Sequence, residues 1–378
     1  MLGSPEQKER LLGQLLAIFE SDDAFNFHDA PEGAPQAIAY AADTVLKHGA
    51  ALVGKRGKEF FTPPEVSRLL VNLVQPKAGE TVGDPCCGSG SLLIACSKFA
   101  HEKSGHSGCS LHGQEKDFHT WALARMNMVL HGETDFQLEW GDTLLAPKLL
   151  AAKNTLRKFD IAVSTPPFSL KEWGHDDAEH DVYNRYARGV PPRISGDYAF
   201  ISHMVETLNP ATGRMATVVP LGVLFRSAAE QQIRRKLIQE NLIEAVIALP
   251  GKIFPYTAIA TAILVLRKNK ADDKILFINA VDLFQHGKTQ NFLRQADVDR
   301  ITDTYLSRSE AVGYARVVSR EEVAANDYSL NVAQYVQPIE GESTVDLKAL
   351  QAERAQLKEE LAALEAKLAN LLKEVGHA

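Results

Sequence analysis

The sequence predicts an α/β fold in which a mostly parallel sheet carries helices on both faces. Short β-rich runs alternate with helical patterns from about residue 65 onward. Three predicted strands end in an acidic residue, namely Asp84, Glu115 and Asp142, and a glycine turn follows the first of them. Ligands of such sheets bind beyond the carboxyl ends of the strands, so these residues are the first candidates for a site.

Each element follows from its hydrophobic pattern. The apolar face from Leu11 to Phe19 predicts an amphipathic helix over 4–20, and a second helix is expected over 36–48. Strands are expected at 81–84, 109–114, 136–140, 159–163, 215–219, 243–248 and 258–266, and helices at 90–101, 117–131, 198–208 and 226–240. The predicted organisation is a short helical N-terminal segment over 1–50, one α/β domain over 51–340 and a C-terminal helix over 341–378.

The first predicted strand leads into a tight turn, Pro85-Cys-Cys-Gly88-Ser89-Gly90, and then into a helix that starts at Ser91. Glycines let the backbone approach a ligand closely, and the first N–H groups of a helix favour an anion. A carboxylate satisfies this requirement as well as a phosphate does. The turn therefore predicts a ligand with an anionic group.

Two better-known glycine motifs are absent. The dinucleotide-binding fingerprint requires a third glycine where Leu93 stands. The phosphate-binding loop requires Ser or Thr after its Gly-Lys pair, but Ile253 follows Gly251 and Lys252. These departures argue against NAD or FAD binding and against an ATPase motor.

The acids that end the next two strands complete a pattern. A carboxylate at Glu115 has the position to accept both hydroxyls of a ribose. Asp142 has the position to accept a hydrogen bond from an adenine amino group. Each acid alone is better explained as a solvated turn residue. Together with Asp84, in this order, they predict a cradle for an adenosine-containing cofactor.

The fourth strand is followed by the turn Thr165-Pro166-Pro167-Phe168. The exocyclic amino group of a base is a poor nucleophile, so a catalyst needs preorganised acceptors for its hydrogens. Two prolines stiffen the backbone and carry no competing N–H. An aromatic ring can stack on a base taken out of a duplex. A rigid turn with a core aromatic is the simpler explanation of such a turn when it stands alone.

These motifs resemble those of amino-methylating DNA methyltransferases. The stretch Asp84 to Gly90 resembles the cofactor motif, Thr165 to Phe168 resembles the catalytic motif, and Glu59 to Pro63 resembles the clamp that precedes the glycine loop in the γ order. The stretches 213–226, 249–259 and 326–331 are similar to the modification subunit of type I restriction-modification systems. The resemblance covers about residues 50–340.

The resemblance implies a class I, Rossmann-like S-adenosylmethionine methyltransferase fold and methylation of adenine N6 in DNA. It implies that the target base is held by Thr165, Pro166, Pro167 and Phe168, and S-adenosylmethionine by Glu59, Phe60, Phe61, Thr62, Pro63, Asp84, Gly88, Ser89, Gly90, Ser91, Glu115 and Asp142. The implied partners are DNA, a sequence-specificity subunit, a second copy of the modification subunit and a nuclease-translocase restriction subunit.

Two features depart from the family pattern. The catalytic position usually holds Asn or Asp, whereas Thr165 offers a shorter and weaker acceptor. This leaves open methylation of cytosine N4, or a cofactor-binding assembly subunit with little activity. A protein-glutamine methyltransferase is a further alternative, but the clamp and the leucine-rich tail argue against it. The second departure is a helical part of only about 50 residues before the clamp.

Two segments outside these motifs suggest contacts. The charged segment 170–198, with Trp173, Arg185, Arg188 and Arg193, is expected to contact DNA or to cover the site. Its Asp and His residues are expected to form a solvated loop and no metal site. In the tail, a leucine stripe at spacings of three and four predicts a helix that packs on a partner helix, or else on its own domain.

Composition limits the remaining possibilities. No apolar run approaches the roughly 18–20 residues that span a bilayer, and no signal peptide is expected, so we expect a cytoplasmic protein without a membrane contact. The four cysteines lack paired CxxC spacing, so neither a disulfide nor a zinc site is expected. The net charge of −7 implies that affinity for DNA comes from a local basic patch or from a partner.

Overall fold

The computed structural model describes residues 62–105, 108–254, 257–288, 290–337 and 354–365. The chain divides into two compact units, Met1–Gln337 and Pro338–Ala378. The helices predicted at 4–20 and 36–48 lie outside the described residues, as do Glu59, Phe60 and Phe61. Within the described ranges, no helix is both long enough and apolar enough to cross a membrane.

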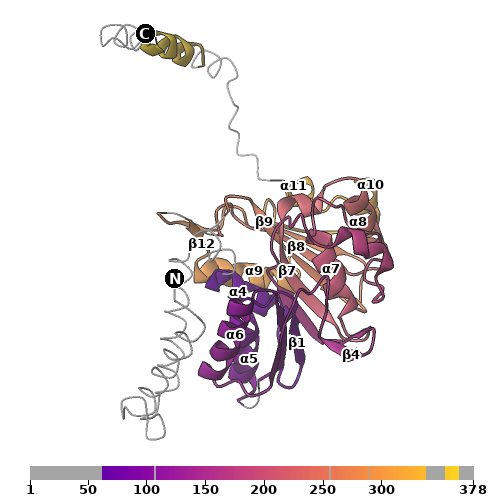
Figure 1. Cartoon of the computed structure of the whole chain (residues 1–378). Helices are drawn as coiled ribbons and strands as arrows, with labels where there is room; N and C mark the ends of the chain where they lie inside the picture. Colours follow the sequence, from indigo (N-terminus) through magenta and orange to yellow (C-terminus); the bar gives the residue numbers. More distant parts are fainter. Residues whose placement is uncertain (1–61, 106–107, 255–256, 289, 338–353, 366–378) are drawn as a thin grey trace, which may run out of the picture. The chain divides into compact units, whose positions relative to one another are not determined.

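A nine-stranded sheet forms the centre of the first unit, in the order β13-β10-β8-β9-β7-β6-β1-β2-β3 (Figure 1). β9 is antiparallel to both of its neighbours and β13 is antiparallel to β10, while the other adjacent pairs are parallel. The mostly parallel sheet is therefore confirmed. Its strands are β1 (Thr81–Asp84), β2 (Ser110–Glu115), β3 (Phe136–Trp140), β6 (Ile161–Ser164), β7 (Arg214–Pro220), β8 (Ile243–Ala248), β9 (Thr261–Arg267), β10 (Ile275–Asn279) and β13 (Ala315–Val318).

Helices cover both faces of this sheet, because alternate strand residues point to opposite sides. Ile263 belongs to one core with one group of helices, and its neighbour Leu264 belongs to a second core with the other group. The first group is α4 (Pro64–Val74), α5 (Ser91–Ser104), α6 (Phe118–Leu130) and α9 (Gln295–Ser307). The second group is α7 (Asp197–Glu206), α8 (Ala229–Gln239), α10 (Arg320–Ala325) and α11 (Val332–Tyr335).

The shorter elements lie in the connections. Two 3-10 helices, η3 (His175–His180) and η4 (Leu221–Leu224), follow β6 and β7 respectively. Two small antiparallel pairs are formed by β4 (Leu150–Ala152) with β5 (Thr155–Leu156), and by β11 (Gln285–His286) with β12 (Asn291–Phe292).

The position of a ligand crevice follows from the strand order. The chain runs from β1 outward to β2 and β3, and then returns to the other side of β1 as β6. The connections that leave β1 and β6 therefore diverge to opposite sides of the sheet. Such a switch point leaves a crevice at the carboxyl ends of the two strands.

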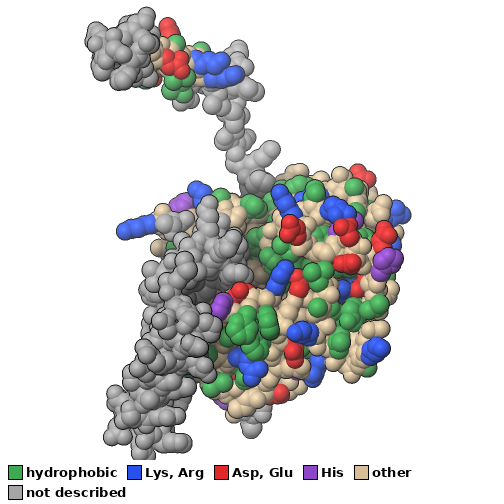
Figure 2. All heavy atoms as spheres, in the orientation of Figure 1, with side chains coloured by type: hydrophobic (Ala, Val, Ile, Leu, Met, Phe, Trp, Pro, Cys, Tyr) green, Lys and Arg blue, Asp and Glu red, His purple; other side chains and the backbone are tan. Residues whose placement is uncertain are grey.

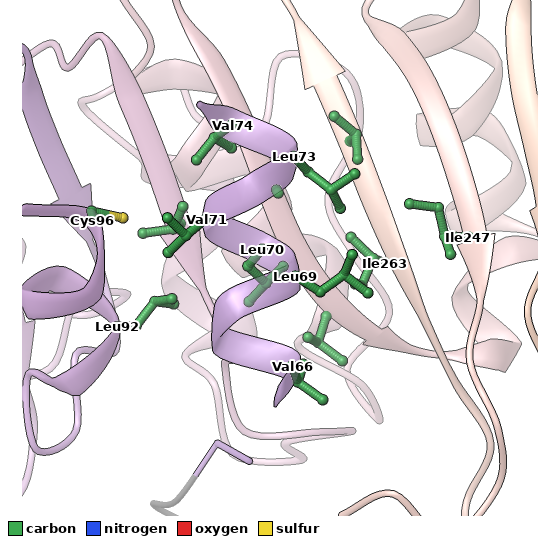
Figure 3. Packing of buried hydrophobic residues seen from close by; sticks show 14 of the residues in the cluster. Val66, Leu69, Leu70, Val71, Leu73, Val74, Leu92, Cys96, Ile247 and Ile263 are labelled. Atoms are coloured by element: carbon green, nitrogen blue, oxygen red, sulfur yellow. The ribbon is translucent and has the colours of Figure 1, made fainter. Parts of the chain in front are cut away.

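Helix α4 closes one side of that crevice, and it is not among the predicted helices. Pro64 stands at its first turn, where the missing N–H costs nothing. Figure 3 shows Val71 directed toward Cys96 of α5 and Leu69 lying beside Ile263 of β9, so the helix is packed from both sides. This packing fixes the place of Thr62, which directly precedes the helix together with Pro63.

The second unit contains the described part of the leucine stripe. Residues 354–365 are helical, and Leu357, Leu361 and Leu364 are all more than half exposed. The helical conformation predicted there is confirmed for these residues. The contact with a partner helix stays a prediction.

Candidate active site

A cavity lies at the carboxyl ends of β1, β2, β3 and β6, beside the start of α4. Its wall includes nine of the predicted site residues, from five separate stretches of the chain. They are Thr62, Asp84, Gly88, Ser89, Ser91, Glu115, Asp142, Thr165 and Pro167. Pro63, Gly90, Pro166 and Phe168 adjoin these residues in the chain but do not line the cavity.

The glycine turn has the backbone conformation that its sequence requires. Gly88 and Gly90 have φ values of 53° and 76°, in the left-handed region that favours glycine. A Cβ atom on Gly90 would also lie 2.8 Å from the side chain of Met128. Gly90 is the N-cap of α5 without a side-chain cap, so the first N–H groups of the helix are available to an anion.

Two side chains from neighbouring elements hold the turn in place. The Asn127 amide of α6 donates to the carbonyl of Ser89 at 2.9 Å. The Thr143 hydroxyl, just after β3, donates to the carbonyl of Pro85 at 2.6 Å. Both ends of the turn are therefore fixed by groups that the fold supplies.

Asp84 is buried at the end of β1. Its Oδ1 atom accepts hydrogen bonds from the backbone N–H of Cys86 at 2.9 Å and from the hydroxyl of Ser164 at 2.7 Å. Burial raises the pKa of Asp84 to about 7, against the opposing effect of these two bonds. A positively charged group beside Asp84 would stabilise its ionised form and so offset the loss of hydration on burial.

Glu115 ends β2 and supports the glycine turn directly. Its Oε2 accepts the N–H of Gly88 at 3.1 Å, and its Oε1 accepts the N–H of Asp117 at 2.8 Å. Burial raises the pKa of this carboxyl as well. Each oxygen keeps one lone pair, so the group retains acceptors for a diol.

Asp142 follows β3 and is held in the same manner. Its Oδ1 accepts the N–H groups of Leu144 and Leu145 at 2.9 and 3.1 Å. Its Oδ2 lies 2.9 Å from the ammonium of Lys116, which also lines the cavity. Lys116, the residue after Glu115, therefore places a positive charge at this end of the cavity.

Ser164 and Thr165 connect β6 to the catalytic turn. Ser164 donates to Asp84, while its carbonyl accepts the hydroxyl of Thr217 at 3.1 Å. The hydroxyl oxygen of Thr165 is buried and has no hydrogen-bond partner among the described residues. A buried polar atom without a partner carries a free-energy penalty of about 1–3 kcal/mol, which a suitable ligand would relieve.

The rest of the turn is supported from α7. Ser169 has a φ of 52°, a left-handed conformation that is strained for a residue with a side chain. Its N–H donates to Oδ1 of Asp197 at 2.7 Å. The Oδ2 atom of Asp197 accepts from Ser195 at 2.7 Å and from Arg226 at 3.1 Å.

Phe168 lies beside the cavity and not in its wall. Its ring packs edge to face against Phe254, with 5.4 Å between the ring centroids. Phe254 is buried, and Phe168 is half-buried against the same core. The predicted stacking of Phe168 on a base stays a prediction.

The comparisons with known proteins agree with this geometry. A family model described as N-6 DNA methylase matches residues 36–344. The chain belongs to this family. It is 34% identical over 357 residues to the type I restriction enzyme MjaVII methylase subunit of Methanocaldococcus jannaschii, which covers 91% of this chain and 59% of that one. It is 32% identical to the MpnII methylase subunit of Mycoplasma pneumoniae, over 96% of this chain and 68% of that one.

Solved structures give the same result for the fold. A type I restriction-modification methyltransferase subunit from Streptococcus thermophilus matches with a TM-score of 0.72 and 31% identity, over 88% of this chain and 69% of that one. A protein from Listeria monocytogenes described as a class I S-adenosylmethionine-dependent methyltransferase shares the fold at 21% identity, with a TM-score of 0.56, over 80% of this chain and 85% of that one. The predicted fold class is confirmed.

The chain spans 59% of the length of the Methanocaldococcus jannaschii relative. A second relative from that organism, the MjaVIII methylase subunit, is 36% identical and is covered over 57% of its length.

Several cavity residues were not predicted from the sequence. They are Ser67 of α4, Lys116, Thr143, Leu170 and Phe200 of α7. Lys116 and Thr143 directly follow the predicted acids Glu115 and Asp142, so proximity in sequence is the signal that would have found them. Leu170 begins the segment 170–198 that was expected to contact DNA or to cover the site, whereas nothing local in the sequence marks Ser67 or Phe200.

The segment 170–198 differs from expectation in its charges. Arg185 is buried and bonds to Asp181 and to the carbonyls of Thr143 and Leu144. Arg188 is buried between two glutamates of other elements. Both arginines are therefore structural: they are buried, and their ion pairs offset the free-energy cost of burying a charge. Neither side chain is available to DNA. Arg193 is exposed but is paired with Asp176.

Metal and disulfide chemistry find no support in the described residues. No group of His, Cys, Asp and Glu in this part of the chain has the arrangement of a metal site. All four cysteines are free. Burial raises the pKa of the Cys86 and Cys87 thiols, so they are poor nucleophiles although they line the cavity.

Proposed function

We propose that this chain transfers a methyl group from S-adenosylmethionine to an exocyclic amino group in DNA, with adenine N6 as the preferred target. One observation carries the proposal. The acids that end β1, β2 and β3 border the same cavity as Thr165 and Pro167. The adenosine end and the base end of the reaction thus have their predicted partners within one site.

The residues of the cavity fit this cofactor. Glu115 would accept the ribose hydroxyls, and the second oxygen of Asp142 would accept the adenine amino group. The free N–H groups of α5 would face the methionine carboxylate. Asp84, a buried carboxylate, would face the positively charged portion. When bound, S-adenosylmethionine supplies an electrophilic methyl group on a sulfonium sulfur.

The catalytic turn supplies the acceptors for the amino group. The Thr165 hydroxyl oxygen has no hydrogen-bond partner within the described part of the chain, so an amino hydrogen of the base would satisfy it. Pro166 and Pro167 carry no N–H that could compete for the same carbonyl groups. Hydrogen-bond acceptance at these points raises electron density on the amino nitrogen and fixes its direction.

The identity of Thr165 supports a second candidate, methylation of cytosine N4. A threonine hydroxyl reaches less far than the carboxamide usual at this position. A cofactor-binding assembly subunit with weak activity is the corresponding non-catalytic alternative. Adenine N6 methylation, cytosine N4 methylation and the assembly role all require cofactor binding. Only the identity of the methylated product distinguishes between them.

The deciding experiment is a methylation assay of the full chain with its specificity subunit, scored separately for N6-methyladenine and N4-methylcytosine. We expect methylated adenine from the wild type and more of it from Thr165→Asn, at unchanged cofactor affinity. Thr165→Ala should lower the rate on the order of 10²–10³-fold. N4-methylcytosine from the wild type, lost in Thr165→Asn, would establish the second candidate. Cofactor binding without either product would establish the assembly subunit.

We assign methyl transfer to residues 51–340 and subunit assembly to 341–378, with 1–50 as a short helical segment. The proposed partners are DNA, a specificity subunit, a second modification subunit and a restriction subunit. The exposed leucines of 354–365 support assembly through this helix, since an exposed apolar stripe favours association. The net charge of −7 supports a division of labour in which a partner supplies part of the DNA affinity.

A further inference from the structure

The hairpin formed by β11 and β12 projects from the body of the first unit (Figure 1). It follows β10, which is parallel to β8. Both β8 and β7 are antiparallel to β9, so β10 runs in the direction of β7, β6 and β1. The carboxyl end of β10 therefore meets the edge at which the cavity opens.

Hydrogen bonds attach this hairpin to the loop that follows β8. The backbone N–H of Asn291 donates to the carbonyl of Lys252 at 2.8 Å, and its side-chain amide donates to the carbonyl of Gly251 at 2.8 Å. The Gln290 amide donates to the carbonyl of Ile253 at 3.4 Å. The hairpin and the loop are thus held as one structure.

The same loop reaches the catalytic turn. Phe254 follows Ile253 directly, is buried, and packs against Phe168. Three successive residues of the loop accept bonds from the hairpin, and the fourth contacts the turn. The hairpin therefore has a fixed position relative to the turn that would hold the base.

The hairpin and the loop that follows β8 both carry basic side chains. Lys252 and Lys288 are exposed, and neither has an ion-pair partner in the part of the chain that the structure describes, nor does His286 between them on β11. By contrast Arg294, next to the hairpin, is paired with Asp297. Figure 2 shows blue and purple side chains on the projecting element. The only acid of the segment 281–292 is Asp282, at its start.

We propose that Lys252 and Lys288 form a contact surface for the phosphate backbone of duplex DNA, beside the position where a base enters the cavity. This inference rests on the proposed function. Unpaired lysines lose little when they bind phosphates, and they release counterions from the DNA. A rigid connection to the catalytic turn sets the distance between the bound backbone and the base site. Contacts of this kind position the DNA without reading its sequence.

The experiment measures binding of the full chain to a fluorescent 30-base-pair duplex without methyl donor, by anisotropy at a series of salt concentrations. Lys288→Ala and Lys252→Ala are compared with Lys274→Ala. Lys274 is exposed and directly precedes β10, so it lies at the opposite end of the same strand. We expect each of the first two variants to bind several-fold more weakly, with a salt slope smaller by about 1. The control should bind as the wild type does.

Three results would overturn the proposal. They are wild-type affinity in both test variants, an equal loss in Lys274→Ala, and no duplex binding by the wild type at 50 mM salt. Calorimetry with S-adenosylmethionine should give the wild-type affinity for all three variants. Failure of methyl transfer would leave the binding comparison valid, whereas failure of the binding comparison would leave methyl transfer intact, so the two proposals fail separately.

Discussion

The two halves of the cavity are built differently. On the cofactor side, each acid that ends a strand accepts an N–H from the turn that follows it, two or three residues later: Asp84 from Cys86, Glu115 from Asp117, and Asp142 from Leu144 and Leu145. On the base side, the catalytic turn is held by residues far along the chain, since Asp197 holds Ser169 and Phe254 holds Phe168.

The cofactor side thus relies in part on hydrogen bonds within a few residues, whereas the base side relies on contacts between segments far apart in the chain. Each carboxylate of the cofactor side has a local N–H donor in the turn that follows it, to which the fold adds Ser164 for Asp84 and Gly88 for Glu115. The catalytic turn takes its shape only when α7 and the loop after β8 have packed against it. Substitutions distant from the cavity should therefore impair base positioning before they impair cofactor binding. Three variants test this comparison, in order of decreasing expected effect.

The first variant is Asp84→Asn, which tests the energetic consequence of burying an acid. The pKa of Asp84 is about 7 in the folded protein, against 3.8 ordinarily. Between these values the unfolded chain loses its proton first, so Asp84 makes folding less favourable as the pH rises. The variant should therefore gain stability relative to the wild type from pH 5 to pH 8, by at most about 3 kcal/mol.

Urea denaturation of both proteins at the two pH values measures this difference. Asp117→Asn is the matched control, because hydrogen bonds from Thr120 lower the pKa of Asp117. That contribution is lost only as the pH falls through the lowered pKa, so the control should show no change between pH 5 and pH 8. A constant difference between Asp84→Asn and the wild type would contradict the cost assigned to this acid.

The second variant is Glu115→Ala, which removes the acceptor for the N–H groups of Gly88 and Asp117 as well as for a ribose. We expect the affinity for S-adenosylmethionine, measured by calorimetry, to fall by roughly 10–150-fold, which corresponds to about 1.5–3 kcal/mol. Glu115→Gln keeps one carbonyl oxygen and should lose less. Unchanged affinity in a folded alanine variant would remove Glu115 from the cofactor site.

The third variant is Asp197→Ala, on the base side. Without its acceptor, the strained Ser169 should relax, and the methyl-transfer rate should fall by about tenfold, the order expected for one charged hydrogen bond. Cofactor affinity should stay at the wild-type value, and Asp197→Asn, which keeps an acceptor oxygen, should retain most of the rate. An equal loss of cofactor affinity would show that the two halves are coupled and would invalidate the comparison.

The contrast between local and long-range interactions also explains which features the sequence could predict. Each of the seven expected strands forms to within about three residues, because an apolar run that ends at an acid or a turn is a local signal. Asp84, Glu115 and Asp142 were placed at one edge by a general property of parallel sheets. These three acids line one cavity together with Thr165, and their roles toward a ligand stay predictions.

The missed features depend on the rest of the fold. The antiparallel insertion of β9 between β7 and β8 leaves no mark in the sequence of β9 itself. Helix α9 buries Val298, Ile301 and Tyr305, whose spacing is helical but sparse among polar neighbours. Phe200 reaches the cavity from α7 only through tertiary packing. Arg185 and Arg188 were expected to be available to DNA, but both are buried, and the two glutamates that pair with Arg188 lie on distant elements.

Ser164 and its neighbour differ in how freely evolution can replace them. The side chain of Ser164 donates to the buried acid of β1, so a residue without a hydroxyl group there would remove one of the two donors that the structure describes for Asp84. The Thr165 hydroxyl, one residue later, has no partner among the described residues. Position 165 is therefore open to exchange without repacking of the scaffold. A lineage can alter its reactivity at this residue while inheriting an unchanged fold.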